Sequence, residues 1–276
     1  MSHQANTRFT FSVTDADDFE VVEFSLTEAL SETFRLDIEL SSPEADIDFA
    51  RIVDRGARFV IWQDERPVRY LNGRISSFFQ GETVFRRTRY RAVLEPPLAR
   101  LALSSDWRIF QTHSAAQILR ILLKEHGIAY DDQLLTEAHL PREYCVQAGE
   151  THLGFLQRLA AEEGIFHRFV HDAEGSRLVL GDHLYIHGAI DGGAVHYNPT
   201  PGGDTARPCL RRFTYGEHVR TGQQAQRDYS FKHPRSQQEY SAQAEDNGYQ
   251  TSQYERFDYP GRYKQESACL LYTSDA

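Results

Sequence analysis

Apolar and polar residues alternate along the first hundred residues of the chain. Phe9, Phe11 and Val13 are separated by polar residues, and a period of two indicates a half-buried β-strand. Similar segments recur as far as residue 94, with turn-forming groups such as Asp-Glu-Arg-Pro and Gln-Gly-Glu between them. Six short strands with one apolar face have to close on themselves or on a second layer, which predicts a barrel or a sandwich. The expected strands are 9–13, 20–26, 34–40, 58–63, 68–79 and 84–94.

The period becomes helical after Phe110. Ser114 and Gln117 have the spacing of a capping box, in which each side chain bonds the other residue's backbone N–H. Gly127 is expected to end this helix, because glycine adopts positive φ without a Cβ clash. The apolar face of the predicted helix consists of Ala115, Ile118, Leu119 and Leu122.

A second helix is predicted after Thr151, whose hydroxyl can cap it. Gly164 ends the helix, and residues 165–170 and 177–181 read as the two strands of a hairpin. Two such helices predict an α/β unit in which both pack on one small sheet. The apolar face of this second helix consists of Leu153, Leu156, Leu159 and Ala160.

Glycine and proline then interrupt residues 186–210, which predicts a linker or a long loop. After it, residues 210–215 and 227–231 read as two further strands. The pattern as a whole predicts an α+β fold that is mainly β.

Several stretches match the pattern of one known family. FLQRLAAEEGIFHRF at 155–169, followed by LVLGDH at 178–183, resembles the signature of the VgrG tip proteins of type VI secretion. The late-control D proteins and the baseplate hubs of contractile-tailed phages share this signature. The further matches, in the family's order, are LSETF at 30–34, DIDF at 46–49, LEPPLARL at 94–101, RIFQ at 108–111, RDYSFKHP at 227–234 and YPGRY at 259–263.

This resemblance implies the hub part of a spike at the tip of a contractile injection machine. It implies a first β-barrel at 8–105, a helix-containing α/β insertion at 106–187, a linker at 188–209 and the start of a second barrel at 210–264. In the family such chains form a homotrimer whose six barrels match a hexameric Hcp-like tube. The implied further partners are spike-capping and effector proteins. A prophage tail hub with the same fold is the alternative machine.

The last ten residues, SACLLYTSDA at 267–276, depart from the family's pattern. The family continues with a charged helix after YPGRY, whereas this segment has no capping signal and no helical period. We expect residues 265–276 to be non-native and to form no part of the fold. A natural variant in which residues 269–273 form a last strand is the alternative.

The composition limits the kinds of binding partner and the cellular compartment that we expect for the protein. The chain has 276 residues, enough for about two domains, and its 40 acidic and 30 basic residues give a formal charge of −10. Such a surface repels nucleic acid and anionic lipid, so neither is expected as a main partner. The three cysteines lie without metal-type spacing, which fits a reducing cytoplasm. No apolar run is long enough to span a membrane and no signal peptide is recognised, so any export is expected to use the type VI apparatus.

No group of residues predicts catalysis. His167 and His171 lie four apart, as do His183 and His187, but the first pair falls in a predicted strand and neither pair belongs to a known zinc motif. We expect ordinary surface histidines; a metal-dependent hydrolase that uses His167 and His171 is the competing hypothesis. Glu162 and Glu163 are adjacent and are expected to be solvated acids at the end of a helix. No catalytic, cofactor-binding or metal-binding residue is predicted, and no cofactor.

Overall fold

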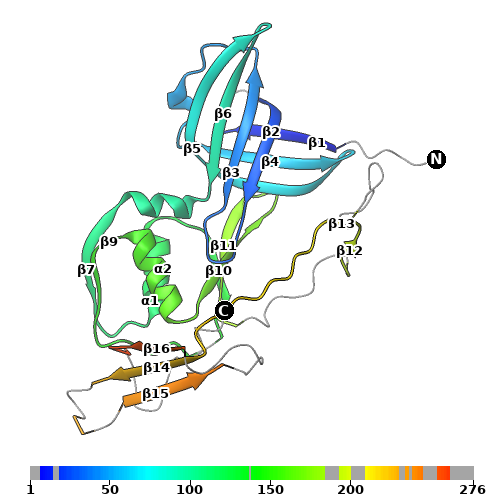
Figure 1. The fold of residues 1–276 in the computed structure, drawn as a ribbon. Helices are drawn as coiled ribbons and strands as arrows, with labels where there is room; N and C mark the ends of the chain where they lie inside the picture. Colours follow the sequence, from blue (N-terminus) through cyan, green and yellow to red (C-terminus); the bar gives the residue numbers. More distant parts are fainter. Residues whose placement is uncertain are drawn as a thin grey trace.

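The computed structural model of the protein describes residues 7–14, 19–136, 138–183, 193–199, 209–229, 234–235, 238–244 and 254–261. Most of these residues with regular structure lie in strands. Six of the strands form a closed barrel, which confirms the predicted fold class. The barrel, a unit with two helices and a separate three-stranded sheet follow one another in space (Figure 1). Among the described residues no helix has the length and apolar character needed to cross a membrane.

The barrel is a ring in the order β1-β2-β3-β6-β5-β4. Its strands are antiparallel, and the ring closes where β1 pairs with β4 and Phe11 lies opposite Phe59. Both of these aromatic side chains are buried. The strands are β1 (Thr7–Val13), β2 (Phe19–Thr27), β3 (Arg35–Ser42), β4 (Gly56–Gln63), β5 (Arg66–Val84) and β6 (Arg87–Glu95), and a short 3-10 helix, η1 (Phe49–Arg51), follows β3.

Period-two alternation locates the barrel strands correctly, because inward positions alternate with outward ones along each strand. In β3, Leu36, Ile38 and Leu40 are fully buried, whereas Asp37 and Glu39 between them are half-buried or exposed. The predicted position of one turn is wrong. The sequence predicts a turn at Gln-Gly-Glu, residues 80–82, but β5 continues through Gly81 to Val84 and turns at Phe85 and Arg86.

A 3-10 helix, η2 (Pro97–Leu103), leads from the barrel into a unit of residues 105–181, called the α/β unit below. Its helices begin and end where the sequence predicts. Ser114 and Gln117 form the expected capping box, and the Thr151 hydroxyl accepts the Gly154 N–H. The elements are β7 (Ser105–Phe110), α1 (Ala115–Glu125), β8 (Tyr130–Leu134), β9 (Cys145–Thr151), α2 (His152–Glu162), β10 (Phe166–His171) and β11 (Ser176–Gly181).

The α/β unit contains two small sheets, whereas the sequence predicts one. The expected hairpin β10–β11 is extended by β8, which pairs with β11 in parallel. A second sheet pairs β7 with β9. Apolar side chains of α1, α2 and β11 form one core, including Leu119, Leu156 and Leu178. The sequence does not predict β8 and β9, because their short, mixed sequences show no clear period.

The last part of the chain is less regular than the sequence predicts. The strand expected at 210–215 is reduced to β13 (Cys209–Leu210), which pairs with β12 (His196–Tyr197) inside the predicted linker. The strand expected at 227–231 begins earlier, as β14 (Gln223–Asp228). This strand lies between β15 (Gln238–Gln243) and β16 (Glu255–Asp258), neither of which was predicted. Residues 262–276, and with them the expectation of a non-native tail, lie outside the described residues.

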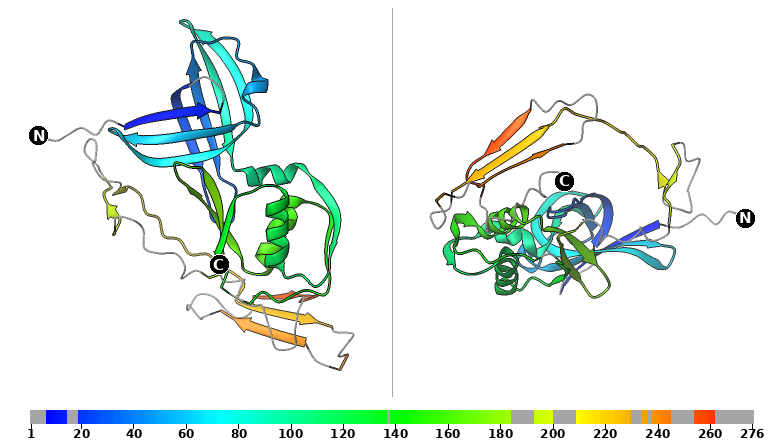
Figure 2. Two further views of the ribbon diagram at one scale, coloured as in Figure 1. Left: turned by 180° about the vertical axis from the view of Figure 1, so that it is seen from behind. Right: turned by 90° about the horizontal axis from the view of Figure 1, so that it is seen from below.

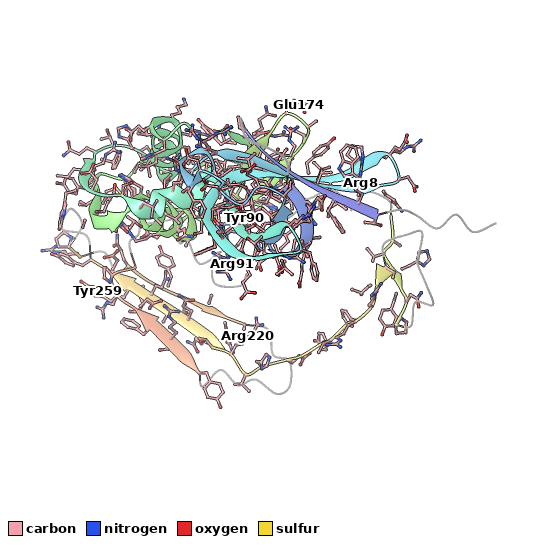
Figure 3. All side chains as sticks on the ribbon, turned by 90° about the horizontal axis from the view of Figure 1, so that it is seen from above. Arg8, Tyr90, Arg91, Glu174, Arg220 and Tyr259 are labelled. Carbon is pink, nitrogen blue, oxygen red and sulfur yellow. The ribbon has the colours of Figure 1, made fainter. Side chains whose placement is uncertain are left out.

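Seen from behind, the same three parts follow one another, with the three-stranded sheet beyond the α/β unit (Figure 2). The interior of the barrel buries aromatic side chains, whereas the three-stranded sheet leaves aromatic side chains exposed. Tyr90 lies inside the barrel and is 1 % exposed, whereas Tyr259 stands on the sheet side of the molecule and is 63 % exposed (Figure 3).

Candidate functional site

The end of α2 is built around buried carboxylates. The Glu163 side chain is only 2 % exposed, and the Arg142 guanidinium donates to its Oε1 at 2.7 Å. The same guanidinium also donates to Glu162. The expectation of solvated acids at this helix end is wrong, because Arg142 lies in a different segment and its contribution cannot be read from the local sequence.

A histidine extends this ionic cluster to the end of β11. The two ring nitrogens of His139 lie 3.1 Å from Glu163 Oε2 and 3.2 Å from Asp182 Oδ2. The backbone N–H and the hydroxyl of Thr136 both donate to Asp182 Oδ1 at 3.1 Å. His139 and Arg142 belong to the connection between β8 and β9, so the cluster fixes this connection to α2 and β11. The carboxylates of Glu163 and Asp182 are buried and paired, so the cluster anchors the β8–β9 connection.

His167 and His171 lie on β10 and face the barrel. His167 is 2 % exposed, and burial lowers its pKa to about 4. The backbone N–H of Asn72 in β5 donates to Nδ1 of His171 at 3.1 Å, and burial lowers the pKa of His171 as well. The expectation of surface histidines is therefore wrong for this pair. The β-strand placement was correct, and on a strand residues four apart are too far separated to hold one ion.

Asn72 also joins the barrel to the β10–β11 hairpin through its side chain. Its Nδ2 donates to the carbonyl oxygens of Asp172 at 3.0 Å and Gly175 at 2.9 Å, while its Oδ1 accepts from Arg58 Nε at 2.9 Å. Nearby, Phe34 packs edge-on against Phe169 with ring centroids 5.4 Å apart. This junction holds the two units in a fixed relation, and the sequence gives no local sign of it.

The second histidine pair is not brought into a described site. His183 is exposed just after β11, and His187 lies outside the described residues. Over the residues that the structure describes, no group of three or more His, Cys, Asp or Glu side chains could hold a metal ion. The absence of a metal in the protein stays a prediction.

Exposed apolar side chains are the remaining candidates for function. On the β7–β9 sheet, Trp107 is 77 % exposed and Ile109 is 59 % exposed, and both lie on the face opposite the buried Phe110. Large exposed aromatic side chains are typical anchors of protein–protein contacts. Alternation within residues 105–110 is the signal that could have identified this face as a strand.

The β14–β16 sheet also exposes aromatic side chains. Tyr254, Phe257 and Tyr259 are each more than half exposed. In the described residues these aromatic side chains stay exposed to solvent and are not packed into a core. Tyr249 and Tyr263 lie outside the described residues.

Comparisons with known proteins match this architecture. The model of the phage tail baseplate hub (GPD) family matches residues 27–273. The type VI secretion system spike proteins VgrG2a and VgrG2b of Pseudomonas aeruginosa are both 48 % identical to the chain, over 96 % and 98 % of its length. The chain spans 32 % of VgrG2a and 27 % of VgrG2b, so it corresponds to about a third of these relatives or less.

Among solved structures, the E. coli c3393 protein is described as a component of the type VI secretion system that resembles the T4 bacteriophage tail proteins gp27 and gp5. It is 27 % identical to the chain, with a TM-score of 0.59 over 63 % of this chain and 49 % of that one. The family predicted from the short motifs is thus confirmed by a match over nearly the whole chain. The chain belongs to the phage tail baseplate hub family and resembles, within it, the hub region of the VgrG spike proteins.

Proposed function

We propose that the chain forms the hub of a spike at the tip of a type VI secretion tube. The observation that carries this proposal is the 48 % identity to VgrG2a over 96 % of the chain. It is supported by the closed barrel and the helix-containing unit that follows it. The identity to spike proteins favours a secretion machine over a prophage tail hub, which has the same fold.

In this proposal the parts of the chain have separate roles. Residues 8–105 form the first barrel, 106–187 the α/β insertion, 188–209 a linker and 210–264 the start of a second barrel. Three chains assemble into a ring with pseudo-sixfold symmetry, which docks on a hexameric Hcp-like tube and carries spike-capping and effector proteins. The protein is assembled in the cytoplasm and exported through the apparatus.

We further propose that this region has no catalytic role. Its most conspicuous titratable groups, Glu163 and His167, are buried among their neighbours rather than directed at an open site. A metal-dependent hydrolase that uses His167 and His171 is disfavoured because His167 is fully enclosed and its strand faces the barrel.

The proposal is tested in a strain that carries a single spike gene. Deleting that gene and restoring it with the full-length protein should abolish and then recover release of the Hcp-like tube protein into the medium. Light scattering should give a trimer for the full-length protein and weak or no association for the 276-residue segment. Tube protein that is released equally with and without the gene would contradict the proposed role.

A further inference from the structure

Two hairpin turns of the barrel differ in how well their residues suit the backbone. The β4–β5 turn is formed by Asp64 and Glu65, and Asp64 has a φ of 57°. Aspartate tolerates this left-handed conformation, since its short polar side chain bonds the local backbone. The β5–β6 turn is formed by Phe85 and Arg86, whose φ angles are 50° and 66°.

The β5–β6 turn is conformationally unfavourable for its sequence. A two-residue hairpin turn with positive φ at both positions strongly prefers Asn-Gly, and a bulky residue with positive φ is an outlier. A glycine is available at Gly81, yet the ladder continues past it until Val84 lies opposite Arg87. Backbone strain of this kind persists where the surrounding structure imposes it, and such positions cluster at binding sites.

The Phe85 side chain contributes nothing to the core. It is 98 % exposed, and its neighbour Val84 is 49 % exposed. An aromatic ring at the end of a rigid hairpin gains free energy only when a partner covers it, and buried aromatic anchors dominate the energetics of interfaces. The strained turn and the exposed ring together indicate a contact point.

Charge specifies what the turn can contact. Arg86 is exposed beside Phe85, and Arg87 follows it and pairs with Glu20 at 2.7 Å. Glu82 is also exposed on β5 near the turn, so Arg86 carries the positive charge of the tip in a chain whose formal charge is −10. The complement of the tip is an apolar socket bordered by carboxylates, because like charges across an interface are unfavourable.

The position of the hairpin shows which side of the molecule it serves. β6 runs from the tip toward η2 and the α/β unit, and the β10–β11 hairpin contacts the barrel at Asn72. In Figure 1 the β5–β6 turn lies at the upper end of the barrel, whereas the described residues after β6 lie toward its lower end and below it. The tip thus points away from the rest of the described chain.

We propose that Phe85 and Arg86 form a docking finger that inserts into an apolar, carboxylate-bordered socket on the tube ring. This inference rests on the proposed function, because that function supplies a ring at the free end of the hub. The finger keeps an unfavourable turn sequence because docking needs the ring of Phe85 and the charge of Arg86.

The test uses the full-length protein and the purified Hcp-like ring of the same secretion system. The double substitution Phe85→Asn with Arg86→Gly removes the finger and installs the preferred turn sequence. We expect its affinity for the ring to fall by at least about thirtyfold, while amide exchange in β5 and β6 slows by about fivefold because the strain is relieved. The matched control, Asp64→Asn with Glu65→Gly, changes the other hairpin and should bind like the wild type.

The outcomes separate the finger from the function on which it rests. Loss of binding with slower exchange supports the finger. Unchanged binding of the double variant beside a wild type that binds overturns the finger and leaves the proposed hub intact. Faster exchange in the double variant contradicts the strain argument. The single substitution Phe85→Ser then tests whether the Phe85 side chain contacts the tube ring. A wild type that does not bind the ring overturns both.

Discussion

The barrel and the α/β unit bury different kinds of side chain. Among the described residues of the barrel, the buried polar side chains are neutral: Ser41, Ser42, Asn72 and Thr88. The α/β unit buries Glu163, His152 and His167. This difference follows from the closure of the barrel. Every barrel strand has two hydrogen-bonded neighbours, whereas the α/β unit has two small sheets and a long β8–β9 connection that needs side-chain contacts to hold it.

This difference separates two sources of stability. The barrel depends on packing of apolar side chains inside a closed ladder, and its core contains no carboxylate or histidine among the described residues. The α/β unit depends in addition on ion pairs and on the protonation state of buried groups. Mutations and pH should therefore act on the two units separately, and amide hydrogen exchange can follow each one.

The largest effect is expected from Phe59→Ala in the barrel. Phe59 is fully buried, and its ring lies 4.7 Å from that of Phe24 and 6.1 Å from that of Phe9. Removing it leaves a cavity and should cost about 4 kcal/mol of barrel stability, measured by urea unfolding and by exchange in β1 and β4. Val68→Ala, at a residue that is 56 % exposed, should change stability by less than about 0.5 kcal/mol. Equal effects of the two substitutions would contradict a packed barrel core.

Arg142→Met should destabilise the α/β unit alone. It leaves the buried Glu163 carboxylate without its guanidinium partner, and breaking a buried ion pair typically costs about 3 kcal/mol or more. Exchange should accelerate in α2 and β9 and stay unchanged in the barrel. Arg35→Met, which breaks the exposed pair with Asp37, is the control and should cost less than about 1 kcal/mol.

Acid should weaken the α/β unit before the barrel. Burial lowers the pKa of His167 from 6.5 to about 4, so between these values the unfolded chain binds a proton that the folded chain does not. Stability is complete above pH 6.5 and is lost as the pH falls toward 4, by about 2 kcal/mol between pH 7 and 5. His167→Gln should flatten this dependence, measured by exchange in β10 and β11, whereas His183→Gln should not. An equally steep loss in the barrel strands far from β10 would argue against a local cause.

The smallest effect is expected at the cap of α1. Ser114→Ala removes the hydroxyl that accepts the Gln117 N–H at 3.2 Å and should cost about 1 kcal/mol, visible as faster exchange in the first turn of α1. Ser114→Asp keeps an acceptor and should restore most of this loss. A cap variant without any effect on α1 would show that tertiary packing alone fixes the start of the helix.

Features that arise from short-range patterns could be predicted from the sequence. The barrel strands follow from period-two alternation, and the helix ends follow from Ser114, Thr151 and the positive-φ glycines Gly127 and Gly164. These features depend on residues within one or two turns of each other. Local propensity was overridden at Phe85, where the register of the β5–β6 ladder decides the position of the turn.

Features that join distant segments could not be predicted. The partners of Glu163 come from residues 139 and 142, and Asn72 contacts a hairpin about a hundred residues further along the chain. Pairwise contacts of this kind have no sequence period. The predicted absence of a catalytic cluster rested on missing motifs, which says nothing of where buried charges meet.

The closure of the barrel also has a consequence for the time course of folding. β1 pairs with β4 along its whole length and with β2 at only two positions, Thr10 and Phe11. As the chain leaves the ribosome, β1 has to wait for β4 before it finds its main partner. Pairings between distant residues slow folding because a long loop must close first. The aromatic residues Phe9 and Phe11 of β1 therefore lack their main partner strand until residue 63 has been made.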